Sequence, residues 1–164
     1  MSAVISKCGQ FRYRLEREIG LSGPVAAVIM VNPSTADASL DDATIRRVVG
    51  FGKRFGWSKV LVGNVFAFRA TDVGALAEAK DPVGPDNLAH LTDILNQAET
   101  TIVAWGPLAK LPSNLRQQWK EVVRISNELG KPLQCLASAK DGHPRHPLML
   151  SYEAVPFSWA PPVG

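Results

Sequence analysis

The sequence predicts an α/β fold: a three-layer α/β/α sandwich around a mainly parallel, four-stranded central sheet, with an N-terminal edge strand or hairpin. Apolar runs alternate with amphipathic segments of helical period, which is the pattern of a parallel sheet with helices on both faces. The run at 25–31 is apolar throughout, as expected for a strand covered on both faces. A chain of 164 residues suits one compact core, so we expect a single domain over residues 1–164.

The first half of the chain contributes three strands and one long helix to this prediction. Residues 11–19 alternate apolar with charged side chains, which indicates a half-buried or edge strand. After the strand at 25–31, residues 41–55 carry apolar side chains at helical spacing behind two aspartates, and Gly56 ends that helix. A further strand is predicted at 59–68, where apolar side chains dominate.

The second half continues the alternation of helix and strand. A short helix is expected at 73–79, and leucine and isoleucine side chains recur on one face of a second helix near 86–98. An apolar strand at 100–105 is followed by an amphipathic helix near 113–129. The last predicted strand, 132–137, completes the four parallel strands of the central sheet.

Composition and charge limit the partners and the location. The chain has 18 Lys and Arg against 15 Asp and Glu, a formal charge of +3, which is compatible with nucleic acid or a nucleotide as partner. No run approaches the roughly 18 apolar residues that a membrane span needs, so we expect no membrane partner and a cytoplasmic location. Cys8 and Cys135 lack the spacing of a zinc site, and we expect neither metal nor cofactor. The oligomeric state stays open.

Several common enzyme classes lose their main sequence support. The chain has no GxxxxGK[ST] phosphate loop, no GxGxxG after the first apolar strand, no GxSxG elbow and no HExxH helix. Nucleotide hydrolases built on a phosphate loop, dehydrogenases, esterases and zinc proteases are therefore disfavoured.

Polar residues follow the first buried strand, where Asn32, Pro33 and Ser34 stand. Ligands of open α/β sheets bind beyond the carboxyl ends of the strands, so this position predicts a site. The carboxamide of Asn32 could hold a water or a ligand carbonyl. It could equally cap the turn by bonding to nearby main chain, as could Ser34.

Asn64 interrupts a strand that is otherwise apolar. A buried carboxamide without hydrogen-bond partners costs about 1–3 kcal/mol, so this residue either binds a planar heterocycle or pairs with neighbouring main chain. Arg69 follows along the chain, is directed toward the same edge of the sheet, and is a further candidate for ligand contact.

Four more polar side chains each have two interpretations. Asp42 and Arg46 could form an acid/base and phosphate-contacting set at a helix start, or stabilise that helix through its dipole and i,i+4 pairing. His143 and His146 lie in a loop with two prolines. Either histidine could stabilise an anion or move a proton, and either could be held in the turn for structural reasons.

Several blocks together resemble a bacterial family of proteins known as domain-of-unknown-function family 1643. The resemblance covers nearly the whole chain and carries no established activity. The blocks that carry it are Asn32-Pro33-Ser34-Thr35-Ala36-Asp37, Asp42-Ala43-Thr44-Ile45-Arg46-Arg47, Asn64-Val65-Phe66-Ala67-Phe68-Arg69-Ala70-Thr71-Asp72, Asp81-Pro82-Val83-Gly84-Pro85-Asp86-Asn87, Ala104-Trp105-Gly106 and His146-Pro147-Leu148.

A more distant resemblance links the order of these blocks to the uracil-DNA glycosylase superfamily. It implies that Asn32 positions an attacking water, Asn64 reads the edge of a base and His146 stabilises the departing pyrimidine anion. The implied function is an N-glycosidic hydrolase that acts on a nucleobase in DNA or in a nucleotide. The alternative is a non-catalytic module that binds a nucleobase, a nucleotide or nucleic acid. In this chain Arg145 and an extra histidine stand where the superfamily has its Ser-Pro loop.

Overall fold

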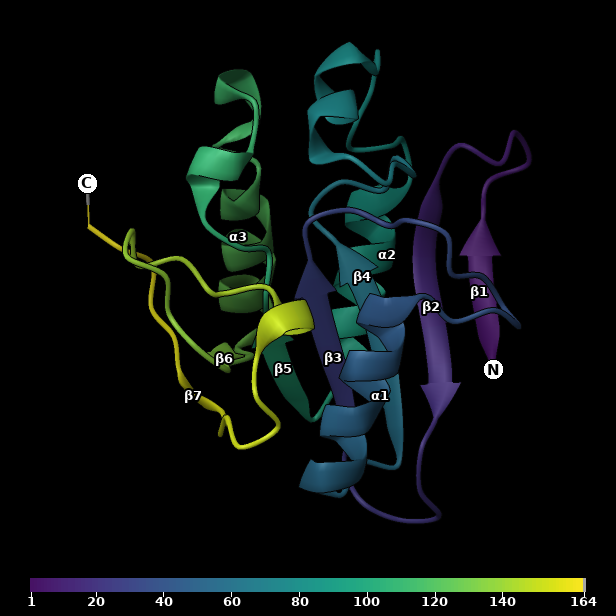
Figure 1. Cartoon of the computed structure of the whole chain (residues 1–164), viewed down its shortest axis with the longest axis vertical. Helices are drawn as coiled ribbons and strands as arrows, with labels where there is room; N and C mark the ends of the chain where they lie inside the picture. Colours follow the sequence, from purple (N-terminus) through teal and green to yellow (C-terminus); the bar gives the residue numbers. More distant parts are fainter. Residues whose placement is uncertain (164) are drawn as a thin grey trace.

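The computed structural model describes residues 1–163, which have a mixed α/β fold (Figure 1). Within this range the strands make a single seven-stranded sheet in the order β1-β2-β4-β3-β5-β6-β7. The strands are β1 (Ser2–Ile5), β2 (Arg12–Glu18), β3 (Val25–Met30), β4 (Lys59–Asn64), β5 (Thr100–Val103), β6 (Gln134–Cys135) and β7 (Phe157–Ser158).

The sheet is mixed, and this corrects the prediction of a four-stranded, mainly parallel sheet. β3 pairs in parallel with β4 and β5, and β5 with β6, so the four anticipated strands are present. The remaining three are antiparallel: β1 and β2 form an N-terminal hairpin that joins the β4 edge, and β7 joins β6 at the other edge. β1 and β7 are short and partly exposed, so they lack the continuous apolar pattern of a buried strand.

The helices lie on both faces of the sheet (Figure 1). α1 packs on one face through Ile45, Val48 and Phe51, in a cluster with β3 and β4 side chains. α2 and α3 pack on the other face in a second cluster. The helices are α1 (Ala43–Phe55), α2 (Asn87–Gln97) and α3 (Trp119–Leu129), and the 3-10 turns are η1 (Val73–Glu78), η2 (Leu108–Lys110), η3 (Ser113–Leu115) and η4 (Pro147–Met149).

The ends of α1 are fixed by the residues that the sequence provides there. The side chain of Asp42 accepts a hydrogen bond from the N–H of Ile45 at 2.9 Å, which caps the first turn. Gly56 takes a left-handed conformation with φ 75° and ends the helix, as only glycine does without strain. The start of α1 lies at the carboxyl end of the parallel strands.

Several predicted elements are shorter than the sequence pattern suggested; the predicted strand at 132–137, for example, is reduced to β6. The predicted strand at 59–68 ends at Asn64, because the chain then turns and Ala67 donates its N–H to the carbonyl of Val83 at 3.0 Å. The expected helix at 73–79 is the 3-10 turn η1, and the helix predicted from residue 113 becomes regular only at Trp119.

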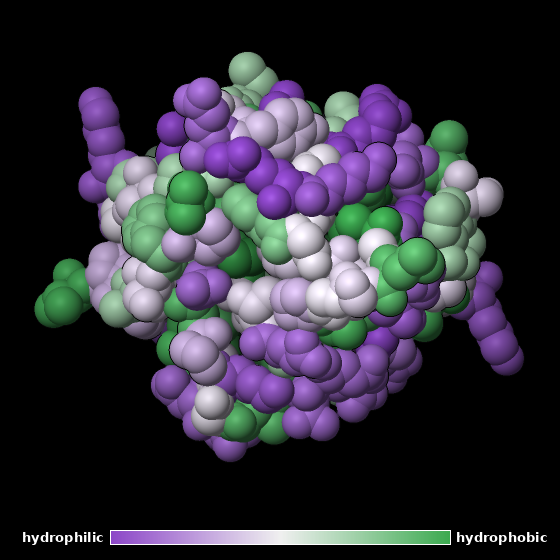
Figure 2. Space-filling view, turned by 90° about the horizontal axis from the view of Figure 1, so that it is seen from below, coloured by the Kyte–Doolittle hydropathy of each residue, from purple (hydrophilic) through white to green (hydrophobic). Residues whose placement is uncertain are grey.

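The end of the molecule at which the parallel strands begin has a mixed surface. Figure 2, seen from below, shows hydrophobic residues there in separate groups between hydrophilic ones. No helix within residues 1–163 combines the length and the apolar character needed to cross a membrane.

Candidate functional site

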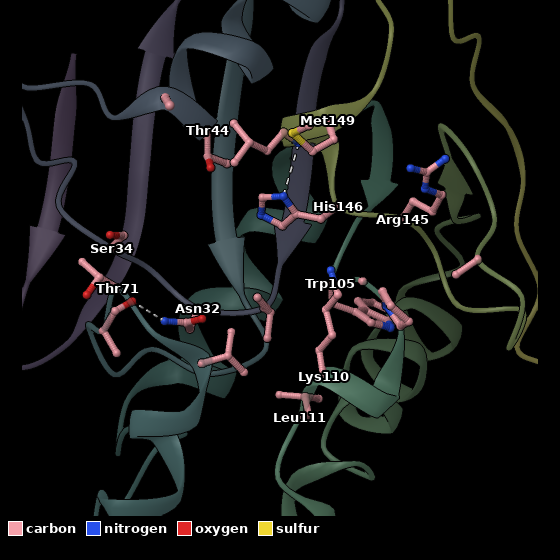
Figure 3. Close-up of a pocket in the computed structure, with 18 of the residues that line it drawn as sticks. Asn32, Ser34, Thr44, Thr71, Trp105, Lys110, Leu111, Arg145, His146 and Met149 are labelled. Carbon is pink, nitrogen blue, oxygen red and sulfur yellow. Dashed lines mark hydrogen bonds between the residues drawn. The ribbon is translucent and has the colours of Figure 1, made fainter.

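A cavity of about 810 Å³ opens at the carboxyl end of the parallel strands (Figure 3). It lies where an open α/β sheet binds ligands, and its size is within the usual range of small-molecule sites. The segments after β3, β4, β5 and β6, the start of α1 and the loop around η4 all contribute to it. Its lining residues include Val31, Asn32, Ser34, Asp42, Thr44, Thr71, Trp105, Lys110, Ser138, Lys140, Arg145, His146 and Met149.

Asn32 presents an oxygen to this cavity. Its Nδ2 donates hydrogen bonds to the carbonyls of Ala70 at 2.8 Å and of Pro33 at 3.1 Å. Both amide hydrogens are then used, so Oδ1 remains as an acceptor. Figure 3 shows the amide nitrogen turned toward the Thr71 segment and the oxygen turned the other way. The nitrogen of Asn32 therefore fixes the turn, as one interpretation predicted, and the contact between its oxygen and a ligand stays a prediction.

His146 presents a donor to the same cavity. Its Nδ1 accepts a hydrogen bond from the N–H of Leu148 at 3.3 Å, so the neutral ring carries its proton on Nε2. Burial lowers the pKa of His146, the positive charge of Lys110 lowers it further, and Asp42 opposes the shift. The imidazole is consequently neutral at pH 7, with an N–H that can stabilise negative charge on a ligand.

Asp42 is the one carboxylate among the described residues that line the cavity. One of its oxygens is committed to the N–H of Ile45. The other makes no hydrogen bond within residues 1–163, and Asp42 is close enough to His146 for its charge to act on that ring. Ser34 also lines the cavity, and its carbonyl accepts a 3.4 Å hydrogen bond from Nε of Arg69.

Three predicted contact residues lie beside the cavity but do not line it. Pro33 is buried and holds the turn through its carbonyl, which accepts from Asn32 and from the N–H of Ala70. Arg69 supports the Ser34 main chain. Arg46 is exposed and donates to the carbonyl of Asp41 at 3.0 Å, so it serves the loop before α1.

Asn64 is fully enclosed, being 1% exposed, and does not line the cavity. Its main-chain carbonyl accepts from Nδ2 of Asn87 at 2.9 Å. Neither Oδ1 nor Nδ2 of Asn64 has a hydrogen-bond partner among the described residues. The structure therefore places this amide outside the pair formed by Asn32 and His146, and the predicted contact between Asn64 and a base has no geometric support.

His143 also lies outside the cavity. It is 3% exposed, and its Nδ1 accepts a hydrogen bond from the indole N–H of Trp105 at 3.2 Å. The rings of Trp119 and Trp159 enclose it, with centroids 4.7 Å and 6.2 Å away. The chain thus distinguishes its two loop histidines: His146 faces the cavity and His143 packs behind Trp105.

The cavity also contains residues that the sequence interpretation did not select. Lys110 follows β5 and Lys140 follows β6, and both line the cavity together with Arg145. A search for cations placed just beyond each predicted strand would have selected them. Among residues 1–163 no group of three or more His, Cys, Asp or Glu side chains is placed to hold a metal ion.

A family model described as "Protein of unknown function (DUF1643)" matches residues 12–148. The chain belongs to this family. The range matched to DUF1643 contains every cavity-lining residue except Met149. No curated protein and no solved structure matches the chain. For this DUF1643 member, the comparisons therefore give no support to the expected likeness to uracil-DNA glycosylases.

Proposed function

We propose that this protein is an N-glycosidic hydrolase that holds a nucleobase in the cavity and cleaves the bond between that base and its sugar, in DNA or in a nucleotide. One observation carries the proposal: the acceptor Oδ1 of Asn32 and the donor Nε2–H of His146 belong to one cavity. The order of the strand-end blocks, similar to that of the uracil-DNA glycosylase superfamily, supports the same chemistry.

The proposed reaction uses three side chains. Oδ1 of Asn32 accepts a hydrogen bond from a water and orients its oxygen toward the anomeric carbon of the sugar. As the water oxygen bonds to that carbon, the C–N bond breaks and its electron pair stays on the base nitrogen. The N–H of His146 stabilises the resulting base anion. The carboxylate of Asp42 takes the proton that the water loses, because a carboxamide cannot accept one.

The test is base release from substrates that present one base in several contexts. Oligonucleotides containing uracil, hypoxanthine or xanthine, and the matching nucleosides and nucleotides, would be incubated with protein and analysed for free base. A base within a duplex must leave the stack before its glycosidic bond can be reached, so single-stranded oligonucleotides belong in the panel. We expect Asn32→Ala and His146→Ala each to reduce the rate by about 10²–10³.

Two matched variants control for general effects of these substitutions. Asn96 is exposed on α2, and His90 stacks on Tyr13 at a ring distance of 5.0 Å; neither lines the cavity. Asn96→Ala and His90→Ala should keep the full rate. Absence of base release from every substrate by folded protein would rule out the hydrolase.

The second candidate is a module that binds a nucleobase, a nucleotide or nucleic acid without cleaving it. The nature of Asn32 favours it, because a carboxamide orients a water but activates it less than a carboxylate in its place would. In that case ligands raise the melting temperature by mass action while no base is released. Thermal-shift measurements with nucleobases and nucleotides, alongside the release assay, separate the two candidates.

A further inference from the structure

The charged side chains that line the cavity are strongly unbalanced in sign. Lys110, Lys140 and Arg145 contribute three positive charges, and Asp42 contributes one negative charge. The chain as a whole carries +3, so this one cavity holds a large share of the excess. A cavity with an excess of one sign attracts ligands of the opposite sign.

These three cations have no ionic partner within residues 1–163. No salt bridge and no side-chain hydrogen bond is formed by Lys110, Lys140 or Arg145 in that range, whereas most other arginines bond to carboxylates or carbonyls. The neighbouring carboxylate, Asp141, forms no salt bridge with them among residues 1–163. Asp141 accepts instead from the main-chain N–H groups of Leu108 at 2.9 Å and His143 at 3.0 Å.

The hydrogen bonds of Asp141 also help to explain why these cations line the same cavity. They tie the loop that carries Lys140 and Arg145 to η2, which carries Lys110. A 2.7 Å hydrogen bond from the N–H of Gly106 to the carbonyl of Pro144 adds a second tie. The fold therefore brings three positive charges to the lining of one cavity, where an anionic ligand would offset them.

Of the two cations labelled in Figure 3, Lys110 lies deeper in the cavity. Figure 3 shows its side chain extending from the opposite wall toward His146, while Arg145 lies farther out. The influence of its charge on the His146 ring agrees with this placement. A group bound by Lys110 would thus stand next to the part of the cavity assigned to the base.

We propose that Lys110, with Arg145 and Lys140 at the rim, binds the phosphate of a free nucleoside monophosphate whose base lies between Asn32 and His146. This inference depends on the proposed function for the position of the base. A volume of about 810 Å³ is large enough for base, sugar and phosphate together. Because Lys110, Lys140 and Arg145 all line one cavity, we favour a single phosphate over a long polyanion, which needs a basic track across the surface.

Isothermal titration calorimetry tests the inference with uridine, inosine, their monophosphates and inorganic phosphate as the probes. At least one monophosphate should bind about tenfold to a hundredfold more tightly than its nucleoside, because hydrogen bonds to charged groups are strong. Lys110→Met should abolish that difference. Arg145→Gln should reduce it partly.

The controls are Lys53→Met and Arg54→Gln, which remove exposed cations from the far end of α1 and should change nothing. Equal affinity for nucleoside and monophosphate overturns the phosphate site. The hydrolase proposal is then decided by the base-release assay alone. Binding of a single-stranded oligonucleotide without binding of any monophosphate overturns it in favour of nucleic acid. Absence of all binding overturns it as well.

Discussion

Trp105 donates its indole N–H to Nδ1 of His143 at 3.2 Å, and each of the two residues is only 3% exposed. The bond makes Nδ1 the acceptor, so the His143 ring is neutral with its proton on Nε2. Trp105 also lines the cavity. His143 therefore influences the candidate site indirectly, by holding the tryptophan that forms part of its wall.

Replacement of His143 by leucine should lower the free energy of unfolding by about 1–3 kcal/mol, because the buried indole N–H of Trp105 loses its acceptor. His143→Gln, which keeps an acceptor, should recover part of the loss. Urea denaturation followed by tryptophan fluorescence measures both. Equal stability of His143→Leu and the wild-type protein would contradict the structural role assigned to this histidine.

The free energy of unfolding should fall as the pH drops below about 6.5. Burial lowers the pKa of both His143 and His146 in the folded protein below the ordinary value of 6.5. Between the two values the unfolded chain binds more protons than the folded one, so acid favours unfolding; above 6.5 neither state is protonated and the contribution is fully present. In a double variant, His143→Gln with His146→Gln, the free energy of unfolding should depend less on pH between about pH 5 and 6.5, a range near the usual histidine pKa. Chemical denaturation at a series of pH values measures this dependence.

Asn64→Leu should raise the free energy of unfolding by about 1 kcal/mol. The carboxamide is buried with neither polar atom hydrogen-bonded among the described residues, and leucine has the same branching without polar groups. Asn87→Leu is the matched control and should destabilise, because Nδ2 of Asn87 donates to the carbonyls of Asn64 and Val65. Loss of stability in Asn64→Leu would show that its amide is paired.

The sequence predicted the elements whose signals are local. The apolar run of β3 and the caps of α1 at Asp42 and Gly56 require no knowledge of distant residues. β7 was not predicted, and the N-terminal hairpin was predicted without the bounds of β1, because such short, largely exposed segments become strands only through their pairing with β6 and β2. The number of strands could therefore not be predicted from local sequence patterns, because it depends on pairing between strands.

The candidate site, like the fold, was predicted only in part. Asn32 and His146 were predicted from their position after strands, and both line the cavity. Asn64 and His143 have the same residue types in similar positions, yet they lie outside it. The face toward which a side chain points is decided by tertiary packing, here the tryptophans around His143. Lys110 was missed because an exposed lysine in a loop is common.

The loop before α1 should depend on Arg17 more than on Asp41. Arg17 is 2% exposed, and its Nε donates to Asp41 at 2.7 Å. Its other nitrogens donate to the carbonyls of Asp37, of Leu40 at 3.3 Å and of Glu16 at 2.9 Å. Arg17→Met removes all of these bonds at once. It should lower the free energy of unfolding by about 3–5 kcal/mol, because three main-chain carbonyls lose a charged donor together.

Asp41→Asn should have a smaller effect on the free energy of unfolding, about 1 kcal/mol, because the carboxylate is 32% exposed and water screens its charge. Arg17 then still bonds to the two loop carbonyls and keeps the loop on β2. Chemical denaturation of both variants at pH 7 gives the comparison. If the two substitutions cost the same, the ion pair alone would hold the loop and the carbonyl bonds would add nothing. A larger loss for Arg17→Met would show that the main-chain bonds of one buried arginine fix the segment that leads into Asp42 and the cavity.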